Sequence, residues 1–104
     1  MQVVLCKMSD LPEGTKKRFE LMGYDILAMH VGGTFYALDA YCTYKYADLG
    51  DAIVDAARGV LVCKDCNSSW ELQTGQAKDP PATFPLTTYE IVPTGDELVL
   101  TFTY

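Results

Sequence analysis

The sequence predicts an all-β domain, built as a sandwich or a barrel. Short apolar segments recur along the chain, and turn residues interrupt them about every ten residues. The 7 tyrosines and 4 phenylalanines, together with many Val, Leu and Thr, favour strands. No segment has a persuasive helical period of apolar residues. A chain of 104 residues is the size of one domain, so residues 1–104 are expected to fold as a single unit.

The chain opens with an apolar run over residues 3–8, in which Cys6 is expected to be a small buried hydrophobic side chain. Residues 9–14 contain Pro and Gly at positions suited to reversing the chain, which predicts a turn. A strand is expected over 17–22, ended by Gly23.

The next two segments are predicted to form a hairpin. Residues 24–31 are apolar with little alternation, which indicates a central strand covered on both faces. Gly32 and Gly33 both tolerate positive φ and suit a two-residue turn into a returning strand over 34–39. The only histidine, His30, lies inside this apolar strand and is expected to be hydrogen-bonded locally, not to ligate a metal.

The second half of the chain contains shorter segments. The strands expected there are 53–54, 60–63, 69–73, 86–92 and 97–103. The last two are predicted to form a closing hairpin about residues 94–96. Leu98, Leu100 and Phe102 alternate with other residues in the final strand, as one buried face requires.

The net charge of −6 and the absence of a basic cluster larger than Lys16, Lys17 and Arg18 argue against nucleic-acid binding. An acidic surface suits docking to basic partner proteins, and it also suits simple solubility. Asp48, Asp51, Asp55 and Asp65 are expected to flank the two cysteine-bearing loops described below.

The sequence also bears on location. Residues 1–8 have no apolar core of signal-peptide length, and no run is long enough to span a membrane. A cytoplasmic location is therefore expected, where thiols stay reduced and closely spaced cysteines more often bind metal than form structural disulfides.

Two loop-like stretches carry the chemistry. Cys63 and Cys66 form a C-x-x-C pair, the spacing that lets two sulfurs reach one metal or one another. Cys42 lies in the stretch 42–50 with Tyr44 two residues after it. A β-scaffold that brings the two loops together would gather three sulfurs, and these are expected to lie within about 4 Å of one another or of one shared metal.

The chain resembles a Rieske-type ferredoxin over essentially its whole length. That family has C-x-H in a first loop and C-x-x-H in a second, and the two cysteines and two histidines bind the two irons of a 2Fe–2S cluster. The corresponding residues here are Cys42, Thr43 and Tyr44, then Cys63, Lys64, Asp65 and Cys66. The surrounding residues also match the family: Leu11-Pro12-Glu13-Gly14, Phe35-Tyr36-Ala37-Leu38, Ser68, Ser69, Trp70, Leu72, Thr74-Gly75 and Pro80-Pro81-Ala82.

The resemblance implies a Rieske-like antiparallel β-sandwich in which the loops 42–50 and 63–69 form a small cluster-binding subdomain. It implies that Trp70 is buried beneath the second loop. It further implies an electron carrier, not an enzyme in its own right, that passes single electrons between a reductase and an oxygenase.

The ligand set departs from the family pattern. Tyr44 and Cys66 stand where the family has histidines, and Asn67 replaces the usual glycine. Three outcomes remain open: a 2Fe–2S cluster held by Cys42, Tyr44, Cys63 and Cys66, a single Fe or Zn held by the three cysteines, or no metal at all. A cluster with two anionic ligands in place of neutral imidazoles would have a lower potential than an ordinary Rieske centre.

Overall fold

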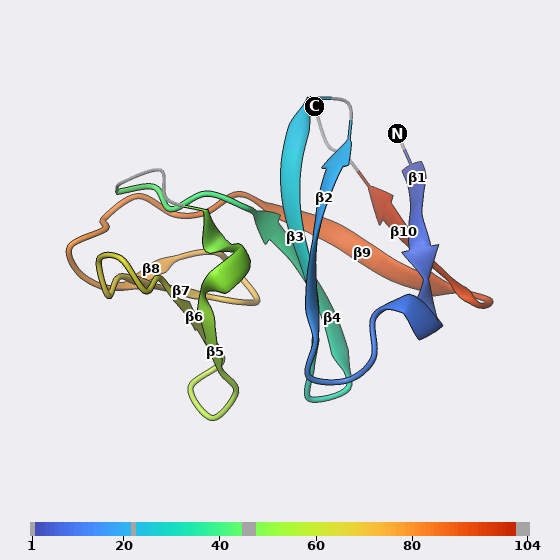
Figure 1. Ribbon diagram of the computed structural model, residues 1–104, viewed down its shortest axis with the longest axis horizontal. Coiled ribbons are helices and arrows are strands. Elements are labelled where there is room, and N and C mark those ends of the chain that lie inside the picture. The colour runs from blue at the N-terminus through green and yellow to red at the C-terminus, as the bar shows by residue number, and fades with distance from the viewer. Residues whose placement is uncertain (1, 22, 45–47, 102–104) are drawn as a thin grey trace.

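The computed structural model describes residues 2–21, 23–44 and 48–101, which form two antiparallel sheets (Figure 1). The larger sheet has the strand order β1-β10-β9-β4-β3-β2. Its strands are β1 (Gln2–Lys7), β2 (Lys16–Leu21), β3 (Tyr24–Val31), β4 (Thr34–Asp39), β9 (Thr88–Thr94) and β10 (Glu97–Thr101). The predicted all-β architecture of two antiparallel sheets is confirmed.

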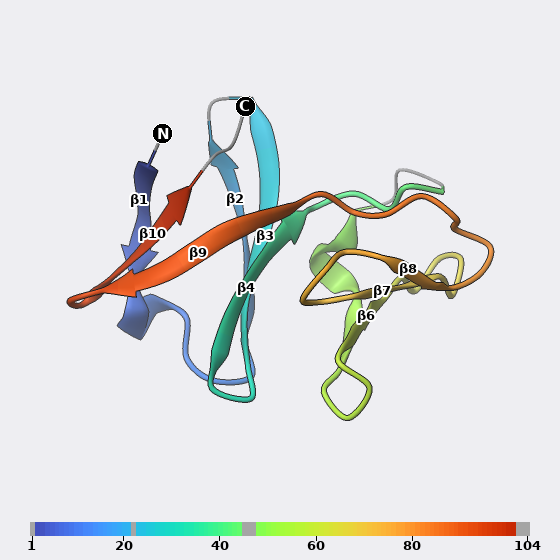
Figure 2. The ribbon, with the colours of Figure 1, turned by 180° about the vertical axis from the view of Figure 1, so that it is seen from behind.

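The smaller sheet has the order β5-β6-β7-β8 and lies to one side of the larger one (Figures 1 and 2). Its strands are β5 (Ile53–Asp55), β6 (Val60–Val62), β7 (Ser69–Glu71) and β8 (Ala77–Asp79). One connection enters this part of the molecule after β4, and another leaves it toward β9, as Figure 2 shows from behind.

Strand β3 is central, as predicted, because both of its faces are covered. Ile26 and Ala28 face clusters formed with β1, β9 and β10. Leu27 and Met29 face the core that continues into the smaller sheet. All four side chains are at most 1% exposed, which explains why the strand lacks polar alternation.

The hairpin between β3 and β4 turns at Gly32 and Gly33, with φ of 61° and 80°, as predicted. The Glu13 carboxylate accepts hydrogen bonds from both glycine N–H groups, at 2.8 and 2.6 Å. His30 is half-buried and hydrogen-bonded, with Nδ1 3.1 Å from the Leu11 carbonyl oxygen. Its partner comes from the turn that precedes β2, so the hydrogen bond is local in space but not in sequence.

Several boundaries differ from the prediction. The run expected over 3–8 ends as a strand at Lys7 and continues as a short 3-10 turn, η1 (Met8–Asp10). Strand β8 was not predicted, because Ala-Lys-Asp has neither alternation nor β-branched residues. Strand β9 begins at Thr88 instead of 86, since the Leu86 N–H donates to the Gly75 carbonyl at 2.8 Å. Met22, at the end of the predicted strand 17–22, and residues 102–103, at the end of the predicted strand 97–103, lie outside the described residues.

The segment before β5 is tied to the larger sheet. Asp48 caps a second 3-10 turn, η2 (Leu49–Asp51), by accepting from the Gly50 N–H at 2.8 Å. Arg18 of β2 hydrogen-bonds to Asp48 and to the Tyr41 hydroxyl, and pairs with Asp25 at 3.2 Å. These contacts fix the end of the first loop against the sheet.

Among the described residues no helix is both long and apolar enough to cross a membrane.

Candidate metal centre

The first loop carries Cys42 into the interior. Cys42 lies shortly after the end of β4 at Asp39, and it is 0% exposed. The Ala40 carbonyl accepts from the Leu49 N–H at 2.7 Å, which closes the loop at its base. Cys42 is therefore held at a fixed place between β4 and η2.

The second loop connects β6 to β7 and is closed by its own backbone. The Asn67 N–H donates to the Cys63 carbonyl at 2.9 Å, and the Cys63 N–H donates to the Ser68 carbonyl at 2.8 Å. Asn67 has φ of 60°, a left-handed conformation that favours glycine and that asparagine tolerates better than most residues. The Gly-to-Asn departure is thus compatible with the turn that this loop requires.

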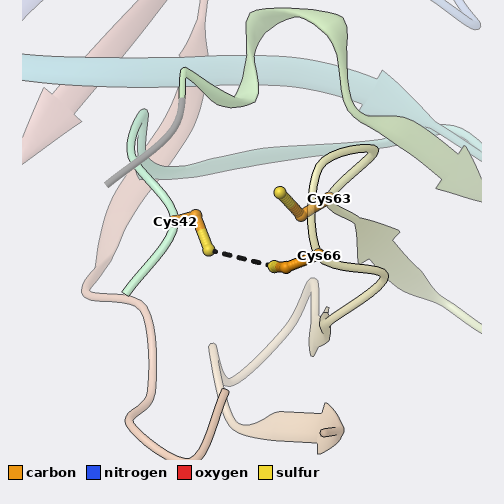
Figure 3. Close-up of side chains that lie close together, drawn as sticks. All are labelled: Cys42, Cys63 and Cys66. Atoms are coloured by element: carbon orange, nitrogen blue, oxygen red, sulfur yellow. Dashed lines mark hydrogen bonds between the residues drawn. The ribbon is translucent and has the colours of Figure 1, made fainter. Parts of the chain in front are cut away.

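The two loops bring three sulfurs together (Figure 3). The Sγ atoms of Cys42, Cys63 and Cys66 all lie within 4.8 Å of one another, and those of Cys42 and Cys66 are 3.5 Å apart. The largest separation slightly exceeds the expected value of about 4 Å. The convergence itself is present, whereas the role of these residues as ligands stays a prediction.

Ser68 supports Cys66, a role that its position in the sequence alone does not reveal. Its Oγ lies 3.1 Å from Cys66 Sγ and accepts from the Ala82 N–H at 2.9 Å. The only signal in the sequence was its place two residues after the C-x-x-C pair, although it proves to be 0% exposed. A buried hydroxyl needs a partner, and the thiol provides one.

The thiols differ in acidity. Burial raises the pKa of Cys63 to about 11. Burial also acts to raise the pKa of Cys66. Hydrogen bonds between Cys66 and the Ser68 side chain and backbone, and between Cys66 and the thiols of Cys42 and Cys63, outweigh this effect, so the pKa of Cys66 is lower than its ordinary value. Of these two thiols, Cys66 is the one more readily present as the thiolate that metals bind.

Tyr44 stands at the rim of the site. Its side chain is 52% exposed, and its backbone N–H donates to Cys42 Sγ at 3.4 Å. The backbone therefore supports the cysteine, whereas coordination by the phenol stays a prediction.

Trp70 lies beneath this end of the molecule and is 0% exposed, as predicted. Its Nε1 donates to the Phe84 carbonyl at 3.1 Å, and Thr43 Oγ1 donates to the same oxygen at 2.9 Å. One carbonyl thus joins strand β7, the first loop and the segment between β8 and β9. The Phe84 ring itself is 71% exposed.

A cavity of about 150 Å³ adjoins Cys63, and three of the four predicted acidic residues line it: Asp48, Asp51 and Asp65. Lys64 and Ala52 complete the lining. Asp55 does not belong to it, because it ends β5 and accepts from the Arg58 N–H at 3.2 Å in the following turn. The three carboxylates outnumber Lys64, so the lining is net negative on the Cys63 side of the site, although Arg18 pairs with Asp48.

The family model for the Rieske 2Fe-2S domain matches residues 1–90. The chain belongs to the Rieske family. A 3-phenylpropionate/cinnamic acid dioxygenase ferredoxin subunit of Photorhabdus laumondii is 32% identical over 91 residues, covering 88% of this chain and 85% of the relative. The protein of the same name from Escherichia coli (strain K12) is 31% identical over 99 residues, covering 95% and 92%.

Solved structures agree with the Rieske fold. The ferredoxin of carbazole 1,9a-dioxygenase from Nocardioides aromaticivorans IC177 superposes with a TM-score of 0.89 at 21% identity, covering 95% of both chains. A chain in a complex of reduced oxygenase and oxidized ferredoxin of carbazole 1,9a-dioxygenase superposes with a TM-score of 0.86 at 27% identity, covering 95% and 91%.

The donor set of this Rieske chain can be compared with the family's cluster. Cys42 and Cys63 correspond to the two cysteine ligands, and Cys66 offers a thiolate, which iron accepts in all-cysteine 2Fe–2S sites. Tyr44 offers a phenol that must lose its proton to bind. In donor chemistry the residues fit a 2Fe–2S cluster, with an anionic side chain at each histidine position.

Proposed function

We propose that this Rieske chain is the ferredoxin component of an oxygenase system and carries single electrons from a reductase to an oxygenase. The ferredoxin subunits that match nearly end to end carry this proposal. The chain is a carrier and not itself an enzyme, as its relatives' names describe ferredoxin subunits of dioxygenases. Its cofactor is the family's 2Fe–2S cluster.

We further propose that residues 1–104 form one domain whose loops 42–50 and 63–69 make up the cluster-binding end. Cys42 and Cys63 would hold one iron, and Cys66 and Tyr44 the other. When bound, the cluster supplies reversible one-electron chemistry at this end of the molecule. The convergence of the three cysteines from two loops at one end of the molecule supports their assignment as ligands.

Individual residues would tune this centre. The buried positions of Cys42 and Cys63 exclude water from their sulfurs, which favours the less charged state. The Tyr44 N–H and the Ser68 hydroxyl lie within hydrogen-bond distance of sulfurs and would stabilise negative charge there. These two hydrogen bonds raise the potential. Burial lowers it, as do two anionic ligands in place of imidazoles with Asp48, Asp51 and Asp65 nearby. We expect their charge to dominate and to give a potential below that of a Cys2His2 Rieske centre.

The same end is suited to partner docking. The exposed side chains of Tyr44 and Phe84 stand beside the loops, and the acidic cavity adds negative charge. A partner with a basic, partly apolar surface would be attracted to it, and added salt would slow the association. A cytoplasmic location, which keeps thiols reduced, is part of this proposal.

The test is reconstitution under anaerobic conditions. Iron and acid-labile sulfide should each be found at two per chain, about the stoichiometry of one 2Fe–2S cluster. The loaded protein should absorb in the visible, and dithionite should produce the paramagnetic signal of a one-electron-reduced cluster. It should then pass electrons from the Escherichia coli 3-phenylpropionate dioxygenase reductase to the matching oxygenase. A loaded cluster that neither the reductase reduces nor the oxygenase reoxidises would contradict the carrier function.

A further inference from the structure

The three sulfurs of the site lie closer together than a cluster of two irons requires. Ligands of a single tetrahedral ion with metal–sulfur bonds near 2.3 Å lie about 3.8 Å apart. Cys42 and Cys66, which would belong to different irons, are separated by 3.5 Å, and all three sulfurs lie within 4.8 Å of one another. Ligands of two bridged irons are separated by the iron–iron distance as well. Cys66 would therefore have to move away from Cys42 to load a cluster, whereas one ion fits with small shifts.

The surroundings also favour one cation. The three thiols come from two loops that backbone hydrogen bonds close at their bases, and the acidic cavity beside Cys63 attracts positive charge. The backbone N–H of Tyr44 and the hydroxyl of Ser68 already lie against two of the sulfurs. Such outer contacts orient metal ligands. Cys66 is half-buried whereas Cys42 and Cys63 are buried, so a fourth ligand would reach the site from the Cys66 side.

We propose that in the cluster-free protein Cys42, Cys63 and Cys66 form a binding site for one thiophilic divalent cation of the zinc class. The ion is held by three thiolates, and its fourth position is taken by water. Each thiol releases its proton to solvent as the sulfur–metal bond forms, so binding one ion frees up to three protons. This inference shares its residues with the proposed cluster site, but it depends only on the thiols and not on electron transfer.

Cobalt(II) titration of the reduced, cluster-free protein tests the site. Cobalt in a tetrahedral thiolate environment gives intense visible bands and a sulfur-to-cobalt charge-transfer band. We expect these bands to saturate at one ion per chain and to disappear when one equivalent of zinc replaces the cobalt. Zinc should slow the modification of Cys42, Cys63 and Cys66 by a thiol reagent relative to the metal-free protein, and it should leave the rate at Cys6 unchanged.

Matched variants separate this site from adventitious thiol binding. Cys6→Ser removes the one cysteine that is not part of the three-cysteine site. It should leave the cobalt spectrum and the cobalt affinity unchanged. Cys66→Ser should lower cobalt affinity at least about tenfold and weaken the charge-transfer band, because one of three thiolate ligands is lost. Equal affinity in Cys66→Ser and the parent, or octahedral cobalt in the parent, would overturn the proposal.

The outcome is independent of the electron-carrier proposal. If the parent binds one tetrahedral ion but never accepts an iron–sulfur cluster, the single-ion site stands and the carrier proposal fails. If it accepts a cluster but the cluster-free form shows no tetrahedral cobalt, the carrier proposal stands and the single-ion site fails.

Discussion

Cys42 Sγ lies 3.5 Å from Cys66 Sγ, although the two residues belong to different loops. In the family pattern these positions serve different irons, and one of them is a histidine. Because Cys66 stands at the histidine position, the site contains a pair of neighbouring thiols, Cys42 and Cys66, which can form a disulfide. A histidine at that position could not. The pair is close enough to react, since a disulfide needs its sulfurs at about 2.05 Å and thus only a modest approach.

Oxidation of the metal-free protein should link Cys42 to Cys66. Diamide removes two electrons and two protons from the thiol pair, and Cys66 is the thiol with the lowered pKa, which favours it as the attacking thiolate. Mass spectrometry of peptides should find this link with Cys6 free. Prior loading with metal or cluster should prevent the reaction. A dominant Cys63–Cys66 link would contradict this prediction, because those two sulfurs also lie within 4.8 Å of each other.

Cys66 should decide cofactor content more strongly than Tyr44 does. Thiolate is soft and readily formed near neutral pH, whereas phenol must lose a proton with a pKa near 10. Cys66→Ser should lose most of the iron found after reconstitution, and Tyr44→Phe should keep most of it. Iron and sulfide analysis of both variants measures the difference. Retention of iron in Cys66→Ser together with its loss in Tyr44→Phe would reverse this ranking.

Restoring the family ligands provides the complementary test. The double substitution Tyr44→His with Cys66→His should give a Rieske-like absorption spectrum and a higher potential than the parent, because neutral imidazoles replace anionic ligands. A folded double variant that assembles no cluster would contradict the ligand positions assigned here.

Trp70→Ala should destabilise the protein by about 3–5 kcal/mol, the usual cost of emptying a large buried aromatic site. The ring is 0% exposed, and Nε1 donates to the Phe84 carbonyl. Trp70→Phe keeps most of the apolar volume but leaves that carbonyl without its indole donor, so it should cost less. Urea denaturation of both variants gives the two values. An unchanged midpoint in Trp70→Ala would mean that the indole adds nothing to the core.

Gly75→Ala should be far more destabilising than Gly95→Ala. Both glycines have positive φ, 78° and 63°, so both substitutions incur the left-handed penalty of about 1–2 kcal/mol. A Cβ at Gly75 would lie 2.0 Å from the Leu86 carbonyl oxygen, whereas at Gly95 it would meet nothing within 4 Å. The difference in melting temperature between the two variants isolates the close approach. Equal losses would show that the Leu86 segment moves away without cost.

Glu13→Gln should reduce stability at neutral pH but not in acid. Hydrogen bonds from the Gly33 and Gly32 N–H groups lower the pKa of Glu13 in the folded protein. A depressed carboxyl pKa stabilises the fold above the unfolded value and loses that contribution as the pH falls through the folded value. The melting temperatures of parent and variant should therefore differ at pH 7 and converge below about pH 4. Glu90→Gln, which removes an exposed carboxylate from β9, is the control for net charge.

The sequence by itself determined the all-β fold and most strands, because alternation, continuous apolar runs and glycine turns are local signals. The Gly32-Gly33 hairpin and the burial of strand β3 follow from such patterns. Strand β8 could not be predicted from the sequence, since its three residues form a strand only because β7 lies beside them. The sequence also supplied the cysteines and the two changed histidine positions.

Only the tertiary structure decided how these residues meet. The separation of Cys42 from Cys66 depends on how the chain closes the loops onto the two sheets, and no local pattern encodes a distance between segments remote in sequence. The same is true of the Phe84 carbonyl that joins Trp70 to Thr43, and of Arg18, which anchors Asp48. Ser68 looked like an ordinary small residue until its burial beside Cys66 gave its hydroxyl a partner. The sequence specifies which chemical groups are present, but the fold determines which groups become neighbours and which lose contact with water.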